Sequence, residues 1–194
     1  MPSTNTAKII SSLIIFSIWL IARIYVYCAN WPYFPLAHTD DSTFNMWYLP
    51  PEIVQHHFAE SMLYLRGEPP LPQLFLGTLM KLAGWPFSWP LDSILLSLAT
   101  LITAFLMQDI MLRFAFNRAL ATGLAAAWCI YPACLGVEVA AFPTAFYEAL
   151  PAFFFTLALW LCLRCFDKEH NRRWLWAFGL AGVMLSMSRS TLSW

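Results

Sequence analysis

The chain has 194 residues, of which 60% are hydrophobic and only 11% are charged, and its formal net charge is zero. A water-soluble domain carries roughly 25% charged residues, so this composition excludes an ordinary soluble protein and predicts an integral membrane protein. The sequence contains no basic cluster, which argues against nucleic acid as a partner.

Five apolar stretches approach the length of about 20 residues that a membrane-crossing helix needs. They predict an all-α protein with a single transmembrane domain, whose helices cover residues 9–27, 91–112, 119–137, 145–165 and 174–193. The third stretch is short and contains Pro132, and the fourth contains Glu148 and Pro151 near its start. The first stretch is too long for a signal peptide, and a small-residue cleavage site does not follow it.

Basic residues predict the orientation, because short cytoplasmic loops are enriched in Lys and Arg. They flank the connections after the second and fourth predicted helices: Arg113, Arg118, Arg164, Lys168, Arg172 and Arg173. Placing both connections in the cytoplasm puts the N-terminus there as well. Residues 28–90 then form a long loop on the outer face of the membrane.

This outer loop contains two predicted amphipathic helices that lie on the membrane rather than cross it. In the first, residues 52–65, an apolar face opposes a polar one. The sequence RGEPP, residues 66–70, ends this helix, because a residue before proline is pushed out of the helical region. The second helix has Leu71, Phe75, Leu79 and Leu82 on one face, and Gln73, Gly77 and Lys81 on the other.

Two groups of acidic residues in the outer loop could carry chemistry. Asp40 and Asp41 follow the first predicted helix. A carboxylate near the bilayer can act as a general base when it is partly desolvated, whereas aspartates in a wet loop are ordinary solvated charges. Glu52, His56 and Glu60 share one helical face, which could bind a divalent cation or could be the solvated face of the helix.

Two arginines lie near the outer ends of predicted membrane helices, Arg23 in the first and Arg189 in the last. Ionisable groups inside such helices usually face a cavity or a partner, and arginine binds phosphate with a planar fork of donors. Either side chain could instead reach the outer lipid headgroups. Glu60 and Glu148 are further candidates for lining the same cavity. This layout suits a site at the outer bilayer surface that handles a lipid with a charged headgroup.

A first helix, a long outer loop that begins with acidic residues, and a helix–Pro-Pro-Leu–helix element together resemble the GT-C superfamily of glycosyltransferases. Residues 61–81, SMLYLRGEPPLPQLFLGTLMK, are similar to the pattern SLxYLHxQPPLxNLxLGxxLK of the bacterial dolichyl-phosphate-mannose mannosyltransferase-like group, which is related to protein O-mannosyltransferases. The motif here reads Glu68-Pro69-Pro70-Leu71. Glu68 replaces the usual His, Lys or Gln, and Arg66 replaces a His.

The resemblance implies that a sugar moves, with inversion, from a polyprenyl-phosphate donor to an acceptor at the outer membrane face. It implies that Asp40 or Asp41 is the catalytic base and that Arg189, with Arg66 or Arg23, meets the donor phosphate. No cofactor is required, although a divalent cation could bind. The bacterial inner membrane is expected rather than the membrane of the endoplasmic reticulum.

Enzymes of this superfamily usually have more membrane helices than the five predicted here. The chain is therefore expected to be the N-terminal portion of a longer protein. The alternative function is a non-catalytic membrane subunit, or an inactive truncated fragment of such an enzyme. The residues indicate neither the sugar nor the acceptor.

Overall fold

The computed structural model describes residues 4–30, 56–58, 60, 70–84, 88–131, 135, 144–166 and 172–188. All regular elements in these residues are helical, which confirms the all-α prediction for the described part of the chain. The helices are α1 (Thr4–Asn30), α6 (Pro70–Ala83), α7 (Ser88–Arg113), α8 (Arg118–Cys129), α10 (Thr144–Cys165) and α11 (Arg172–Met187).

Five of these helices fall where the apolar stretches predict them. Two are long and apolar enough to cross a membrane by length and composition, over Asn5–Ala29 in α1 and Ser93–Arg113 in α7. At about 1.5 Å per residue, each complete helix is about 40 Å long, against a hydrocarbon core of about 30 Å. The apolar part of α10, Ala149–Cys165, is shorter.

The prediction of a third helix over residues 119–137 is corrected by the structure, in which this helix is shorter. Its helix, α8, begins after Asn117, whose side-chain oxygen accepts a hydrogen bond from the Ala119 amide at 2.8 Å. It ends at Cys129, because Ile130 has left the helical conformation with φ −105° and ψ 4°. Pro132 follows two residues later, where a proline commonly stands after a helix end. At 12 residues, or about 18 Å, α8 alone is too short to cross a bilayer.

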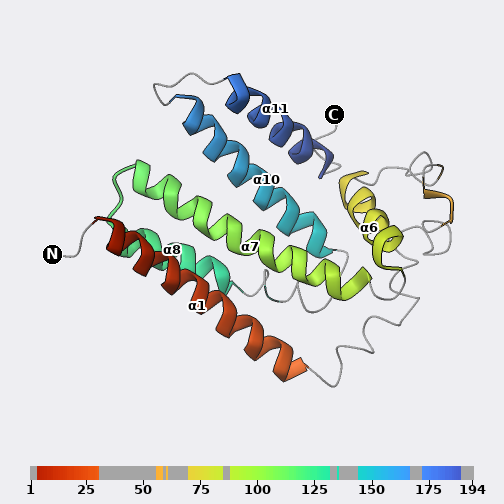
Figure 1. The fold of residues 1–194 in the computed structure, drawn as a ribbon, viewed down its shortest axis with the longest axis horizontal. Coiled ribbons are helices and arrows are strands. Elements are labelled where there is room, and N and C mark those ends of the chain that lie inside the picture. The colour runs from red at the N-terminus through yellow and green to blue at the C-terminus, as the bar shows by residue number, and fades with distance from the viewer. Residues whose placement is uncertain are drawn as a thin grey trace.

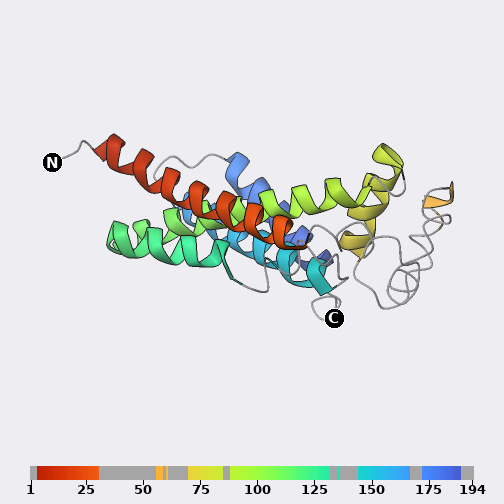
Figure 2. The ribbon, with the colours of Figure 1, turned by 90° about the horizontal axis from the view of Figure 1, so that it is seen from below.

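The helices pack around α7, which contacts α1, α6, α8 and α10 (Figure 1). On one side of α7, α1 and α8 pack together, and the view from below shows α1 stacked over α8 (Figure 2). On the other side, α10 packs on α7 and α11 packs on α10. The α7–α8 connection, the end of α10 and the beginning of α11 lie at the same end of the molecule as the start of α1, and α6 lies at the opposite end (Figure 1).

Polar side chains are buried between these helices, while large apolar ones face outward. The buried polar residues are Ser11, Arg23, Ser93, Ser97, Thr100, Thr103, Gln108, Thr122 and Ser188. Several are satisfied internally, as where Gln108 Nε2 donates to Thr122 Oγ1 at 2.9 Å. In contrast, only 17% of the apolar segment of α1 is buried, and Ile94, Leu98 and Ile102 form an exposed apolar stripe on α7. Apolar residues such as Ile15 and Leu101 are buried as well, so the unusual feature of this bundle is its outward apolar surface.

The helix α6 confirms the predicted second helix of the outer loop, but its buried face differs from the prediction. Gly77, Leu79 and Met80 are buried, whereas Leu82, expected on the apolar face with Leu79, is 77% exposed. Lys81 is exposed as predicted. The first predicted helix of that loop, residues 52–65, lies outside the described residues except for 56–58 and 60.

Candidate functional site

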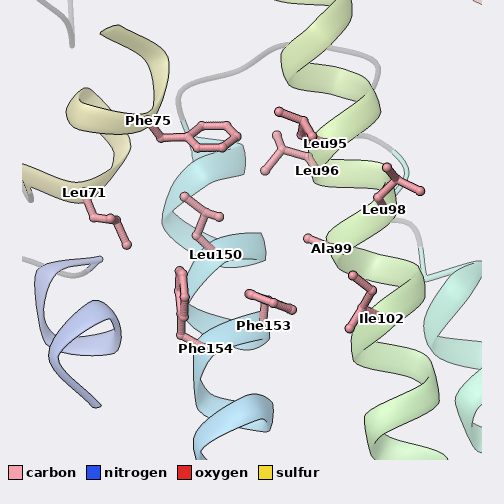
Figure 3. A pocket seen from close by; sticks show the side chains of 10 residues that line it. All are labelled: Leu71, Phe75, Leu95, Leu96, Leu98, Ala99, Ile102, Leu150, Phe153 and Phe154. Carbon is pink, nitrogen blue, oxygen red and sulfur yellow. The ribbon is translucent and has the colours of Figure 1, made fainter. Parts of the chain in front are cut away.

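An apolar pocket of about 320 Å³ lies between α6, α7 and α10 (Figure 3). Its lining consists of Leu71, Phe75, Leu95, Leu96, Leu98, Ala99, Ile102, Leu150, Phe153 and Phe154. The volume is at the lower end of the range for small-molecule pockets, about 300–1,000 Å³. Because all ten lining side chains are apolar, the pocket suits a hydrocarbon group rather than a polar one.

The helical repeat places these side chains toward one another. Leu71 and Phe75 are four residues apart on α6 and point toward α10, as Figure 3 shows. From α10, Phe153 and Phe154 contribute two rings whose centroids are 5.1 Å apart in an edge-on arrangement. On α7 the lining residue Ala99 has only a methyl group, which leaves space that a larger side chain would fill.

The pocket meets the predicted Glu68-Pro69-Pro70-Leu71 motif at one residue. Pro70 is the first residue of α6, and Leu71 lines the pocket. The first two members of the motif lie outside the described residues, as does Arg66. The last residue of the motif therefore forms part of the wall of the apolar pocket.

The side chains of five other predicted site residues lie outside what the structure describes. Outside the described residues lie Asp40, Asp41, Glu52 and Arg189; Glu148 lies in α10, but its side chain is not described. Their assignments as base, phosphate ligand and cavity residue stay predictions.

Arg23 lies inside the helix bundle. Its side chain is buried, with Nε donating to Ser97 Oγ at 3.2 Å and Nη1 donating to the carbonyl oxygen of Cys129. The guanidinium also lies over the ring of Trp19, at 5.5 Å from the centroid. Because Cys129 is the last residue of α8, its carbonyl lacks a partner within the helix, and Arg23 supplies one. The two sequence interpretations placed this side chain at a phosphate or at headgroups, whereas the structure has it joining α1, α7 and α8.

Glu60 is exposed, and its Oε2 lies 3.1 Å from His57 Nδ1. The sequence pattern groups Glu60 with His56 on one helical face, whereas its observed partner is the next residue, His57. Among the described residues, no group of three or more His, Cys, Asp and Glu side chains could hold a metal ion.

An ionic cluster that the sequence analysis did not single out joins the ends of α7 and α10. Asp109 Oδ2 accepts hydrogen bonds from Trp160 Nε1 at 2.7 Å, Arg113 Nε at 3.2 Å and Arg164 Nη2 at 3.4 Å. The sequence contains two spacings of four residues from which this cluster could have been predicted, Asp109 to Arg113 and Trp160 to Arg164. Each places its pair on one helical face, and the predicted threading puts both pairs at the same side of the membrane.

Comparisons with known protein families, curated proteins and solved structures find no match to this chain. The resemblance of residues 61–81 to glycosyltransferases therefore stays a prediction from the motif. The pocket and the helix packing around it are the geometry from which a function can be argued.

Proposed function

We propose that the chain is a multi-pass membrane protein with its N-terminus in the cytoplasm. In this arrangement α1, α7, α10 and α11 cross the bilayer, and α8 begins a further crossing. The outward apolar faces of α1 and α7 support the proposal, because side chains that face lipid have no need of polar groups. The buried pairs made by Arg23 and Gln108 support it too, because polar groups at membrane depth must be satisfied within the protein.

Within that membrane protein, the function best supported is transfer of a sugar from a polyprenyl-phosphate donor to an acceptor at the outer face. The observation that carries this proposal is the position of Leu71. The motif that resembles glycosyltransferases ends at a wall of the apolar pocket, where the first part of an isoprenoid chain would find hydrocarbon contacts. The phosphate and the sugar would then lie beyond the pocket, toward the outer loop.

The proposed chemistry uses residues of the outer loop and of the last predicted membrane helix in three steps. Asp40 or Asp41 removes a proton from the acceptor hydroxyl or amine. The acceptor attacks the anomeric carbon from the side opposite the lipid phosphate, so the bond from that carbon to the phosphate oxygen breaks with inversion. Positive charge from Arg189 and Arg66 stabilises the departing phosphate. Arg23 has no step here, since its described partners belong to the protein.

The test measures sugar transfer by the purified chain in proteoliposomes that contain a radiolabelled polyprenyl-phosphate sugar. Asp40→Asn and Asp41→Asn are compared separately with the unchanged protein. We expect one of them to lower kcat by about 10²–10⁴-fold, the usual contribution of a general base. Full activity in both variants would overturn the assignment of the base.

The same assay tests the pocket with Ala99→Trp, which fills it from α7. We expect KM to rise for a long-chain donor and to change less for a donor with one or two prenyl units. Ala127→Trp on the exposed face of α8 is the matched control and should leave both KM values unchanged. If Ala99→Trp raised KM equally for the two donors, the pocket would not be the binding site of the lipid chain.

A further inference from the structure

The wall that α10 gives to the apolar pocket contains a proline. Pro151 is buried inside this helix, at the level of the pocket. Of the pocket-lining residues on α10, Leu150 precedes the proline, and Phe153 and Phe154 follow it (Figure 3). A proline has no N–H group, so the helix lacks the hydrogen bond to the carbonyl four residues earlier. A bend at Pro151 would therefore move Leu150 relative to the two phenylalanine rings.

Threonine hydroxyls share backbone carbonyls at the same level on both α7 and α10. On α10, Thr156 Oγ1 donates to the Ala152 carbonyl at 2.8 Å. On α7, Thr103 Oγ1 donates to the carbonyl of the pocket-lining residue Ala99, also at 2.8 Å. A hydroxyl that competes for a helical carbonyl favours bending of the helix. The backbone of both walls is therefore easier to bend at the pocket than a regular helix.

Below the pocket, side-chain contacts hold α10 against α7. Asp109 Oδ2 of α7 accepts hydrogen bonds from Trp160 Nε1 at 2.7 Å and from Arg164 Nη2 at 3.4 Å, both on α10. Trp160 lies about 10 Å along the helix from the pocket-lining residue Phe153. One end of α10 is thus fixed to α7, and the proline lies near the other end.

The part of α10 before the proline, residues 144–150, is short enough to move as a unit. It is about 10 Å long, so a bend of about 20° moves its end by about 3–4 Å. Two carbon atoms in contact are about 3.5–4.0 Å apart, and a movement of this size is enough to admit a hydrocarbon chain. A proline that only shaped the helix would need neither the threonine bonds nor lining residues on both of its sides.

We infer that α10 bends at Pro151 and that this bending opens the pocket to a hydrocarbon chain. Residues 144–150 move, while the part of α10 that Asp109 holds stays against α7. The bound chain contacts Leu150 on the moving side of the hinge, and Phe153 and Phe154 on the fixed side. The inference rests on the proposed function only in that the pocket takes the lipid chain of the donor, and it does not depend on sugar transfer.

Distances between nitroxide labels test the bending directly. One label is placed on the native Cys28, exposed near the end of α1, in full chains whose other cysteines are replaced. The second is placed on Ala145→Cys before the hinge or on Leu159→Cys after it. In detergent, we expect double electron–electron resonance to give a broader distance distribution for the 28–145 pair than for the 28–159 pair. Geranylgeranyl phosphate should shift the 28–145 distance by about 3–4 Å and leave the 28–159 distance unchanged.

Pro151→Ala restores the missing N–H donor, so it should narrow the 28–145 distribution to the width of the 28–159 distribution and abolish the shift. Thr156→Val removes the hydroxyl that competes for the Ala152 carbonyl and should narrow the 28–145 distribution in part. The matched control, Ser186→Ala, removes a similar bond from α11, to the Val183 carbonyl, and should change neither distance.

Equal widths for the two pairs, or a shift that persists in Pro151→Ala, would overturn the inference. If Pro151→Ala does not fold, Thr156→Val decides the matter, and an unchanged width in that variant would overturn the inference as well.

Binding of geranylgeranyl phosphate, counted by native mass spectrometry, separates this inference from the proposed enzyme. We expect Pro151→Ala to lower the affinity severalfold and Ser186→Ala to leave it unchanged. A chain that binds the lipid and bends but transfers no sugar would keep the hinge and refute the glycosyltransferase. If Pro151→Ala bound the lipid and transferred sugar as well as the unchanged chain does, the enzyme would stand and the hinge would not. A chain that does not bind geranylgeranyl phosphate would refute both.

Discussion

Ala115 closes the connection between α7 and α8 in a backbone conformation that favours glycine, with φ 60°. Its amide donates to the Leu112 carbonyl, and the Phe116 amide donates to the Met111 carbonyl. This pair of bonds is a Schellman motif, in which the residue after the helix adopts the left-handed conformation. A side chain with a Cβ in that conformation costs about 1–2 kcal/mol.

Ala115→Gly should therefore raise the free energy of unfolding by about 1 kcal/mol, because the relief of strain exceeds the added freedom of the unfolded chain. Ala127→Gly is the matched control on the exposed face of α8. It should lower the same free energy by about 1 kcal/mol, since glycine is a poor helix former. Unfolding in mixed micelles, followed by circular dichroism, measures both. A loss of stability in Ala115→Gly would contradict the capping role.

The burial of Arg23 shows how a single residue escapes sequence reasoning. The sequence predicts that Arg23 lies near the end of an apolar helix and that it needs a partner. It does not predict the partner, because Arg23 bonds to the carbonyl of Cys129 at the end of α8, and that end lies eight residues before the predicted one. An error in one helix boundary thus hid the contact of a residue on another helix.

At the scale of elements, α8 packs through small residues. Ala121, Ala125 and Cys129 are spaced by four and are fully buried, and the last two belong to a cluster with Ile15 of α1 and Leu101 of α7. Small side chains let helix backbones approach closely, which is the usual way in which helices associate where lipid removes the hydrophobic driving force.

Ala125→Leu should lower the free energy of unfolding by about 1–3 kcal/mol, because three added carbons must enter a closely packed junction of α1, α7 and α8. Ala127→Leu makes the same change two residues away on the exposed face and should be nearly neutral. The comparison uses unfolding in mixed micelles. Equal effects of the two variants would mean that α8 does not pack through this face.

The positions of helices were more predictable from the sequence than their contact faces. Long apolar runs fix α1, α7, α10 and α11 because few alternatives bury so many backbone polar groups. The contact faces of the helices are less predictable. In apolar surroundings the free energy of a leucine side chain is similar whether it faces outward or inward. On α6, Leu82 accordingly faces outward and Gly77 inward, against the pattern expected for a helix with one wet side. The pocket, which depends on three such faces, could not be predicted.

At the scale of the whole molecule, side-chain contacts set the relative directions of the helices. Arg23, near the end of α1, reaches Ser97 in the first half of α7, and these two helices run in opposite directions (Figure 1). Asp109 and Arg164 join the ends of α7 and α10, which therefore run the same way. The α7–α8 connection, the end of α10 and the beginning of α11 thus share one end of the bundle with the start of α1, as Figure 1 shows. That end holds the arginines that predict the cytoplasmic side.

This arrangement predicts the accessibility of cysteines on the two sides of the membrane. In a chain whose other cysteines are replaced by serine or alanine, Cys28, exposed near the end of α1, should react with a membrane-impermeant maleimide in intact spheroplasts. Phe116→Cys, exposed in the α7–α8 connection, should react only after the membrane is permeabilised, because the two positions lie at opposite ends of the bundle. The opposite pattern would invert the orientation while keeping the crossings. Reaction of both cysteines in intact spheroplasts would show that the bundle does not span the membrane, since a spanning bundle must shield one of its ends.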